Sequence, residues 1–175
     1  MSATTNTAVS PAFDRERAPD ALSGLIIVLP CFDEAENLPD AVRLATDAAE
    51  RCAAAHEIVV VDDGSSDDTA DVAARLVALD PRLRLIVHGE NCGYGQALRT
   101  GIAAARLPWV LLTDADLQCD CAFRLVRREL VQRLDLRASG ALVGTELLVK
   151  SRAAGARVAD LRQALRGRRI PRVGV

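Results

Sequence analysis

Residues 57–67 read EIVVVDDGSSD, and this stretch decides the predicted fold class. The four apolar residues after Glu57 are typical of a buried strand in a parallel sheet. Two acids and a glycine end the strand. Ser65, Ser66 and Asp67 are candidate caps for a helix that follows. The stretch therefore predicts a strand, a polar loop and a helix in succession.

The same alternation continues on both sides of this stretch. Apolar runs and helical spacing predict strands at 24–29, 57–61, 84–87 and 109–113, and helices at 37–55, 67–79 and 95–105. This order predicts an α/β fold, with a mostly parallel sheet and helices on both faces. After Thr113 the pattern weakens. There it indicates a short strand at 122–126, helices at 127–134 and 142–154, and a last short strand at 157–161.

Length and composition favour one globular domain. The chain has 175 residues, of which 50% are hydrophobic and 26% charged, so bulk disorder is excluded. We expect a flexible arm at 1–22, a domain at 23–160 and a basic tail at 161–175. The first 23 residues lack the basic and apolar regions of a secretory signal, and no apolar run is long enough to span a bilayer. We therefore expect a cytoplasmic protein.

Charge is unevenly distributed along the chain. Residues 1–121 contain 20 acids and 9 bases, a net of −11, whereas residues 122–175 contain 4 acids and 13 bases, a net of +9. The basic third either faces a phosphate, a nucleic acid or an anionic membrane surface, or is a solvated tail. Aromatic residues make up only 3% of the chain, so platforms for base stacking are scarce. We expect no nucleic-acid partner.

The cysteines and histidines give no metal motif. Five cysteines, an odd number, favour free thiols in a reducing compartment. Cys119 and Cys121 have a C-x-C spacing without a second pair, so zinc is not expected. His56 and His88 have no acid at motif spacing and are interpreted as ordinary residues flanking strands.

Acidic residues follow three of the predicted strands. The pairs are Asp33-Glu34, Asp62-Asp63 and Asp114-x-Asp116. Ligands of open α/β sheets bind at the carboxyl ends of the strands, where these acids are expected to gather. Asp114 and Asp116 are two apart on an extended segment, so both carboxylates face one side. With the carbonyl oxygen of Gln118 they suit Mg²⁺ or Mn²⁺; the alternative is a pair of solvated loop acids.

The glycine loop at 91–95 belongs to neither common nucleotide-binding motif. It lacks the Gly-Lys-Ser/Thr of a Walker loop, and the first strand ends in Pro30 without a G-x-G-x-x-G, which argues against a dehydrogenase. Gly93 and Gly95 either let the loop pass close to a ligand before a helix N-terminus or form an ordinary turn.

Four segments in register, 26–38, 57–67, 91–101 and 114–118, resemble the family 2 glycosyltransferases of GT-A fold. The likeness is strongest to the branch of dolichol-phosphate mannosyltransferase and polyprenyl-phosphate sugar transferases. It implies a nucleotide-diphospho-sugar transferase with a Rossmann-like sheet. It also implies transfer from a UDP- or GDP-sugar to a lipid phosphate. The basic third would then face that phosphate or an anionic membrane.

The resemblance also implies residue roles. Val61 and Asp63 would hold the base, the Asp accepting from a ring N–H. A divalent ion on Asp114, Asp116 and Gln118 would bridge the diphosphate, and Asp116 would serve catalysis directly. The implied nucleotide contacts are Pro30, Phe32, Glu34, Val61, Asp63, Asp114, Ala115 and Asp116.

Two departures from the family pattern bear on activity. Tyr94 stands where the family usually has a lysine between the two glycines, and the chain after Gln118 resembles later family segments, as if after an internal deletion. Residues 119–160 would then be a shortened acceptor half in a truncated C-terminal region. Glu146 is a candidate catalytic base there, or one exposed acid on an Arg-rich helix.

Three other functions compete with transfer. The first is a nucleotide-sugar-binding remnant without turnover. The second is a nucleotidyltransferase, which would normally carry a Gly-rich basic signature after its first strand; residues 30–34 lack one. The third is a nucleic-acid binder acting through the arginine tail.

Overall fold

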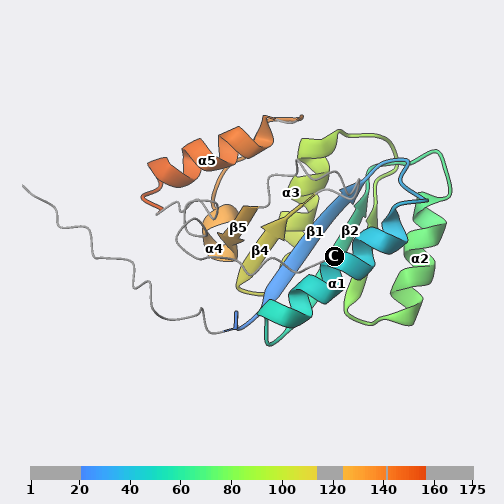
Figure 1. The fold of residues 1–175 in the computed structure, drawn as a ribbon. Helices are drawn as coiled ribbons and strands as arrows, with labels where there is room; N and C mark the ends of the chain where they lie inside the picture. Colours follow the sequence, from blue (N-terminus) through green and yellow to red (C-terminus); the bar gives the residue numbers. More distant parts are fainter. Residues whose placement is uncertain (1–20, 114–123, 141, 157–175) are drawn as a thin grey trace, which may run out of the picture.

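A computed structural model describes residues 21–113, 124–140 and 142–156. Its core is a five-stranded sheet with the order β3-β2-β1-β4-β5 (Figure 1). The strands are β1 (Leu25–Cys31), β2 (His56–Asp62), β3 (Leu83–Val87), β4 (Trp109–Leu112) and β5 (Arg124–Arg127). The first four pair in parallel, and β5 pairs antiparallel with β4 at the sheet edge.

Helices cover both faces of this sheet. They are α1 (Leu38–Cys52), α2 (Thr69–Leu79), α3 (Tyr94–Ala104), α4 (Arg128–Val131) and α5 (Val143–Ala153). Alternate residues of β1 belong to two cores: Leu25, Ile27 and Leu29 pack with α1 and α2, whereas Ile26 and Val28 pack with α3, α4 and α5. Since β1 is buried on both faces, it is continuously apolar rather than alternating.

The predicted α/β fold is confirmed. Each strand and helix predicted between residues 24 and 113 is present, with ends shifted by at most a few residues. The weaker predictions at 122–126, 127–134 and 142–154 correspond to β5, α4 and α5. The strand predicted at 157–161 lies outside the described residues. Leu22, predicted to belong to the arm, forms a parallel bridge with Ala53.

The first strand runs past its predicted end at Leu29 and includes Pro30. The carbonyl oxygen of Cys31 accepts from the Asp63 N–H, so Cys31 faces β2. Pro30 therefore faces the side of β4, and β4 stops pairing with β1 at Val28. Proline has no backbone N–H to donate. It is tolerated here because the paired part of β4 has already ended, so the sheet needs no donor at this position.

Among the described residues, no helix is long and apolar enough to cross a bilayer. The longest, α1, has 15 residues and carries charged side chains.

Candidate active site

The loops after β1 and β2 are joined by a set of short hydrogen bonds. Asp33 accepts from the Ser66 backbone N–H at 2.7 Å and donates its own N–H to Ser65 Oγ at 2.9 Å. The Glu34 N–H donates to Thr69 Oγ1 at 2.8 Å. Asp33 has a φ of 54°, a left-handed conformation that Asp tolerates better than most residues. These contacts fix the two loops as one rigid edge.

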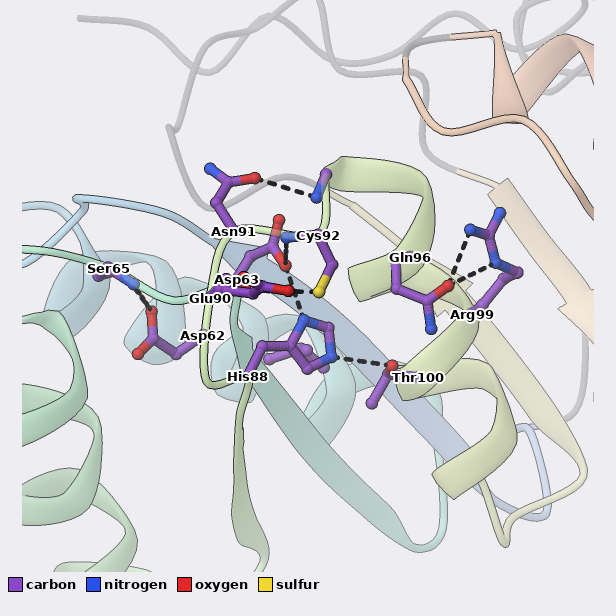
Figure 2. Close-up of polar contacts among 12 residues, drawn as sticks. Asp62, Asp63, Ser65, His88, Glu90, Asn91, Cys92, Gln96, Arg99 and Thr100 are labelled. Carbon is purple, nitrogen blue, oxygen red and sulfur yellow. Dashed lines mark hydrogen bonds and ion pairs between the residues drawn. The ribbon is translucent and has the colours of Figure 1, made fainter.

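The acids in this edge differ in what they do. Asp62 accepts from the Ser65 backbone N–H at 3.2 Å and from the Ser65 hydroxyl, so it shapes the turn (Figure 2). Asp67 accepts from the Thr69 hydroxyl and backbone N–H at the start of α2, and the hydroxyl contact lowers the pKa of Asp67 below its usual value. Asp33, Asp62 and Asp67 therefore hold the loops in place.

Asp63 has a different set of partners. Its Oδ1 lies 2.6 Å from His88 Nδ1 and accepts from the Cys92 backbone N–H at 3.1 Å. The other ring nitrogen of His88 lies 3.0 Å from Thr100 Oγ1 on α3, so the imidazole bridges the carboxylate and the hydroxyl (Figure 2). The interpretation of His88 as an ordinary flanking residue is wrong. Its acid partner, Asp63, is 25 residues away in the sequence. The two residues become neighbours because β2 and β3 pair in the sheet.

The Asp63, His88 and Cys92 ligand atoms all lie within 4.8 Å of one another. Two ligands around one tetrahedral zinc ion are about 3.3 Å apart, given metal–ligand bonds of about 2 Å. The 2.6 Å between Asp63 and His88 is instead a hydrogen-bond distance. We interpret the cluster as a hydrogen-bonded network.

A cavity of ≈ 610 Å³ opens at this edge. Four residues expected to contact the nucleotide line it: Pro30, Phe32, Glu34 and Asp63. Phe32 is 43% exposed, whereas Asp63 is 4% exposed. Val61 does not line the cavity; its side chain is buried in the core that faces α3, and its predicted role in base binding stays a prediction. The rest of the lining is mostly apolar and comes chiefly from α3 and α5, with Arg124 and Asn91 as polar members.

The glycine loop approaches the chain's own backbone closely. Gly93 has a φ of 87°, which favours glycine. A Cβ at Gly95 would lie 2.0 Å from the Ala138 carbonyl oxygen, so residues 138–139 need a glycine there. The close approach at Gly95 is thus to the chain's own segment, and the predicted approach to a ligand stays a prediction.

Glu146 is held by three donors. Its carboxylate accepts from the backbone N–H groups of Arg137 and Ala138 at 2.9 and 2.8 Å and pairs with Lys150 at 2.8 Å. The Lys150 hydrogen bond, with the backbone N–H groups, lowers the pKa of Glu146 to about 2. With this low pKa the Glu146 carboxylate is a weak base that stays ionised. It is therefore suited to holding the backbone N–H groups of residues 137–138 against α5. The catalytic role expected for Glu146 stays a prediction.

The expected metal ligands Asp114, Asp116 and Gln118, with Ala115, lie outside the described residues. The residue before them is placed: the Thr113 N–H donates to the Val28 carbonyl oxygen at 3.4 Å. The chain therefore leaves β4 beside Pro30, at the edge where Asp63 lies. Cys119 and Cys121 also lie outside the described residues, and Cys31, Cys52 and Cys92 are free thiols.

Comparison with known proteins decides the family. Residues 26–135 match the model of glycosyl transferase family 2. The chain belongs to this family. The match includes all the described loops of the site and the segment with Asp114 and Asp116. The family membership predicted from the four sequence segments is thus confirmed.

Several relatives are similar over the same region. An undecaprenyl-phosphate 4-deoxy-4-formamido-L-arabinose transferase of Sodalis glossinidius is 37% identical over 101 residues, which cover 57% of this chain and 31% of the relative. Glycosyltransferase AglD of Haloferax volcanii is 34% identical over 125 residues, 68% of this chain and 20% of AglD. The chain thus spans less than a third of the length of these family members.

Two solved structures align with part of this chain. The mannosyltransferase PcManGT of Pyrobaculum calidifontis, in complex with GDP-Man and Mn²⁺, aligns with a TM-score of 0.46 and 25% identity, covering 58% of this chain and 31% of that one. S. aureus TarS 1-349 in complex with UDP-GlcNAc aligns with a TM-score of 0.45 and 20% identity, covering 53% and 26%.

Proposed function

We propose that this chain binds a UDP- or GDP-sugar and transfers the sugar to a polyprenyl phosphate. The observation that carries the proposal is the Asp63 carboxylate, buried at the wall of a cavity that Pro30, Phe32 and Glu34 also line, inside the region that matches the family. Two similar proteins support the substrate classes: PcManGT is in complex with GDP-Man, and the Sodalis relative is named for undecaprenyl phosphate.

Asp63 would recognise the base. An ionised carboxylate only accepts hydrogen bonds, so at the ring nitrogen of a base it pairs with an N–H and is repelled by a lone pair. Uracil and guanine have such an N–H, whereas adenine and cytosine have a lone pair at the corresponding ring nitrogen. The chemistry of Asp63 therefore favours uridine or guanosine diphosphate sugars over their adenosine and cytidine counterparts.

The donor set after β4 fits Mg²⁺ or Mn²⁺. Asp114 and Asp116 offer hard carboxylate oxygens, and Gln118 offers a carbonyl oxygen. Thr113 leaves the sheet at the edge where the cavity opens, which favours placing these ligands near the diphosphate. A divalent ion held there would stabilise the negative charge that grows on the departing nucleoside diphosphate.

The transfer would be a single displacement. A phosphate oxygen of the acceptor forms a bond to the anomeric carbon as the bond to the nucleoside diphosphate breaks, and the leaving group departs with the electron pair. An acceptor phosphate is already ionised, so it requires little help from a general base. This reaction is compatible with a Glu146 that is held by three donors.

The acceptor side would lie near an anionic membrane surface. The basic C-terminal third and the exposed side chains of Leu148 and Val149 on α5 favour peripheral contact at the cytoplasmic face. The domain boundaries at 23–160, with a shortened acceptor half from 119, belong to this proposal.

A transfer assay tests the function. The purified chain is incubated with Mn²⁺, undecaprenyl phosphate in detergent and a panel of radiolabelled UDP- and GDP-sugars, and label is measured in the extracted lipid. We expect metal-dependent labelling from one donor, abolished by Asp116→Ala. Donor binding without labelled lipid would instead favour a binding protein without turnover.

A further inference from the structure

The contacts of Asp63 assign a role to a residue outside the expected nucleotide contacts. We propose that His88 is a positioning residue: it orients the Asp63 carboxylate so that Oδ2 faces the ring N–H of the donor base. The inference rests on the proposed function, because it concerns how the same cavity selects its nucleotide.

The first step is the occupancy of the two carboxylate oxygens. Oδ1 receives both His88 and the Cys92 N–H. Within the described part of the chain, Oδ2 has no hydrogen-bond partner, while Asp63 lines the cavity. A carboxylate with one oxygen bound on the protein side presents its other oxygen in a fixed direction. The free oxygen is therefore suited to an incoming donor.

The second step is the protonation of the ring. An ionised Asp63 accepts only, so Nδ1 of His88 must carry the proton of this contact. In the neutral ring Nε2 then accepts, and the Thr100 hydroxyl, at 3.0 Å, is positioned to donate to it. Asp63 thus selects the tautomer, and the Thr100 hydroxyl, which can donate or accept, completes it by holding Nε2 in place.

The third step is the rigidity of the set. The side chains of His88 and Asp63 are 13% and 5% exposed, so neither rotates freely into solvent. The His88 backbone N–H donates to the Asp62 carbonyl oxygen at 2.9 Å, and the Asp63 N–H donates to the Cys31 carbonyl oxygen at 2.9 Å. The sheet therefore fixes both ends of the contact. Such preorganisation lowers the entropy lost when the base binds.

A base analogue isolates this role from simple folding effects. Binding of UDP and GDP is measured by calorimetry with Mn²⁺, and the better ligand is compared with its analogue methylated on the ring nitrogen, 3-methyl-UDP or 1-methyl-GDP. A hydrogen bond to a charged group stabilises binding by about 1.5–3 kcal/mol, so methylation should weaken wild-type binding on the order of 10–100-fold.

His88→Ala should reduce this preference for the unmethylated base by roughly 10-fold while leaving the affinity for the methylated analogue unchanged. His88→Asn should restore most of the preference, because the Asn side-chain amide places an N–H near the position of Nδ1. Thr100→Val should act in the same direction as His88→Ala, but less. His56→Gln, at the opposite end of β2, is the matched control and should behave as the wild type.

The outcomes separate the inference from the function. A folded His88→Ala variant that keeps the full wild-type preference overturns the role of His88, although the nucleotide site then stands. An Asn variant that behaves like the Ala variant also contradicts it, since the donated N–H would not matter. A wild-type chain that binds no nucleoside diphosphate overturns the proposed function and this inference with it.

Discussion

The Gly95 backbone N–H donates to the Ser139 carbonyl oxygen at 2.8 Å, which joins the start of α3 to the segment before α5. Arg99, one turn further along α3, donates to the neighbouring Ala138 carbonyl oxygen at 2.8 Å. Glu146 binds the N–H of the same Ala138. Residues 138–139 are thus attached directly to the helix that follows the glycine loop, and α5 after them contributes apolar side chains to the cavity.

Replacing Gly95 by Ala should destabilise the fold. The added Cβ would lie 2.0 Å from the Ala138 carbonyl oxygen, so the backbone must shift. Overpacking of this kind costs about 1–3 kcal/mol, which in a chain of this size lowers the melting temperature by roughly 2–12 °C. Gly140→Ala is the control, because a Cβ there has open space. Equal melting temperatures for the two variants, measured by circular dichroism, would contradict the close approach.

Glu146 should contribute to stability in a pH-dependent way. Its folded pKa of about 2 is below the ordinary 4.5. A lowered carboxylate pKa gives stability that is complete above the unfolded pKa and is lost as the pH falls through the folded one. The contribution should therefore fade between about pH 4.5 and pH 2, and Glu146→Gln should flatten that part of the urea-unfolding profile. Glu36→Gln, which changes an exposed carboxylate, should leave the profile unchanged.

The cysteines should differ in reactivity. Burial, with nearby carboxylates, raises the pKa of Cys31 to about 12, so its thiol stays protonated at neutral pH. Cys52 and Cys92 are exposed. Iodoacetamide, followed by peptide mass mapping, should label those two and spare Cys31 in the native chain. Cys92 lies beside Asp63, so a bound nucleotide should slow its labelling but not that of Cys52; equal rates would place the nucleotide elsewhere.

The acid pair after β4 should control metal-dependent binding. Asp114→Ala or Asp116→Ala should remove the rise in melting temperature that Mn²⁺ adds to nucleotide binding, because the bridging ion loses a ligand. Asp120→Ala changes an acid in the same segment outside the pair and should keep the rise. An Asp114→Ala chain with the wild-type Mn²⁺ effect would show that the pair is solvated.

The fold was largely predictable from local pattern. Strands buried on both faces must be continuously apolar. Runs such as Ile26 to Leu29 and Ile58 to Val61 can therefore be recognised as strands from the sequence alone. The strand β5 has a weaker signal because it is a half-exposed edge strand, in which Leu125 is exposed and arginines stand at both ends.

The site was predictable only in part. The rule that ligands bind at the carboxyl edge of the sheet predicts that Phe32 and Asp63 belong to one site, and both line the same cavity. It did not distinguish Asp62, which shapes a turn, from Asp63, because the difference depends on which hydrogen bonds form. The link from Asp63 to His88 joins neighbouring strands, and the link to Thr100 adds a helix, so neither has a sequence spacing to reveal it. The position of His88 directly after β3 was the one available signal.

The most direct test is the Mn²⁺-dependent binding of UDP and GDP, measured by isothermal titration calorimetry on the wild-type chain and on Asp63→Asn. Loss of an acceptor for a charged hydrogen bond corresponds to about 10–100-fold in affinity. We expect one of the two nucleotides to bind only with the metal, and Asp63→Asn to weaken that binding by this factor while keeping the wild-type melting temperature. Equal affinities of the two chains, or binding indifferent to the base, would contradict the account.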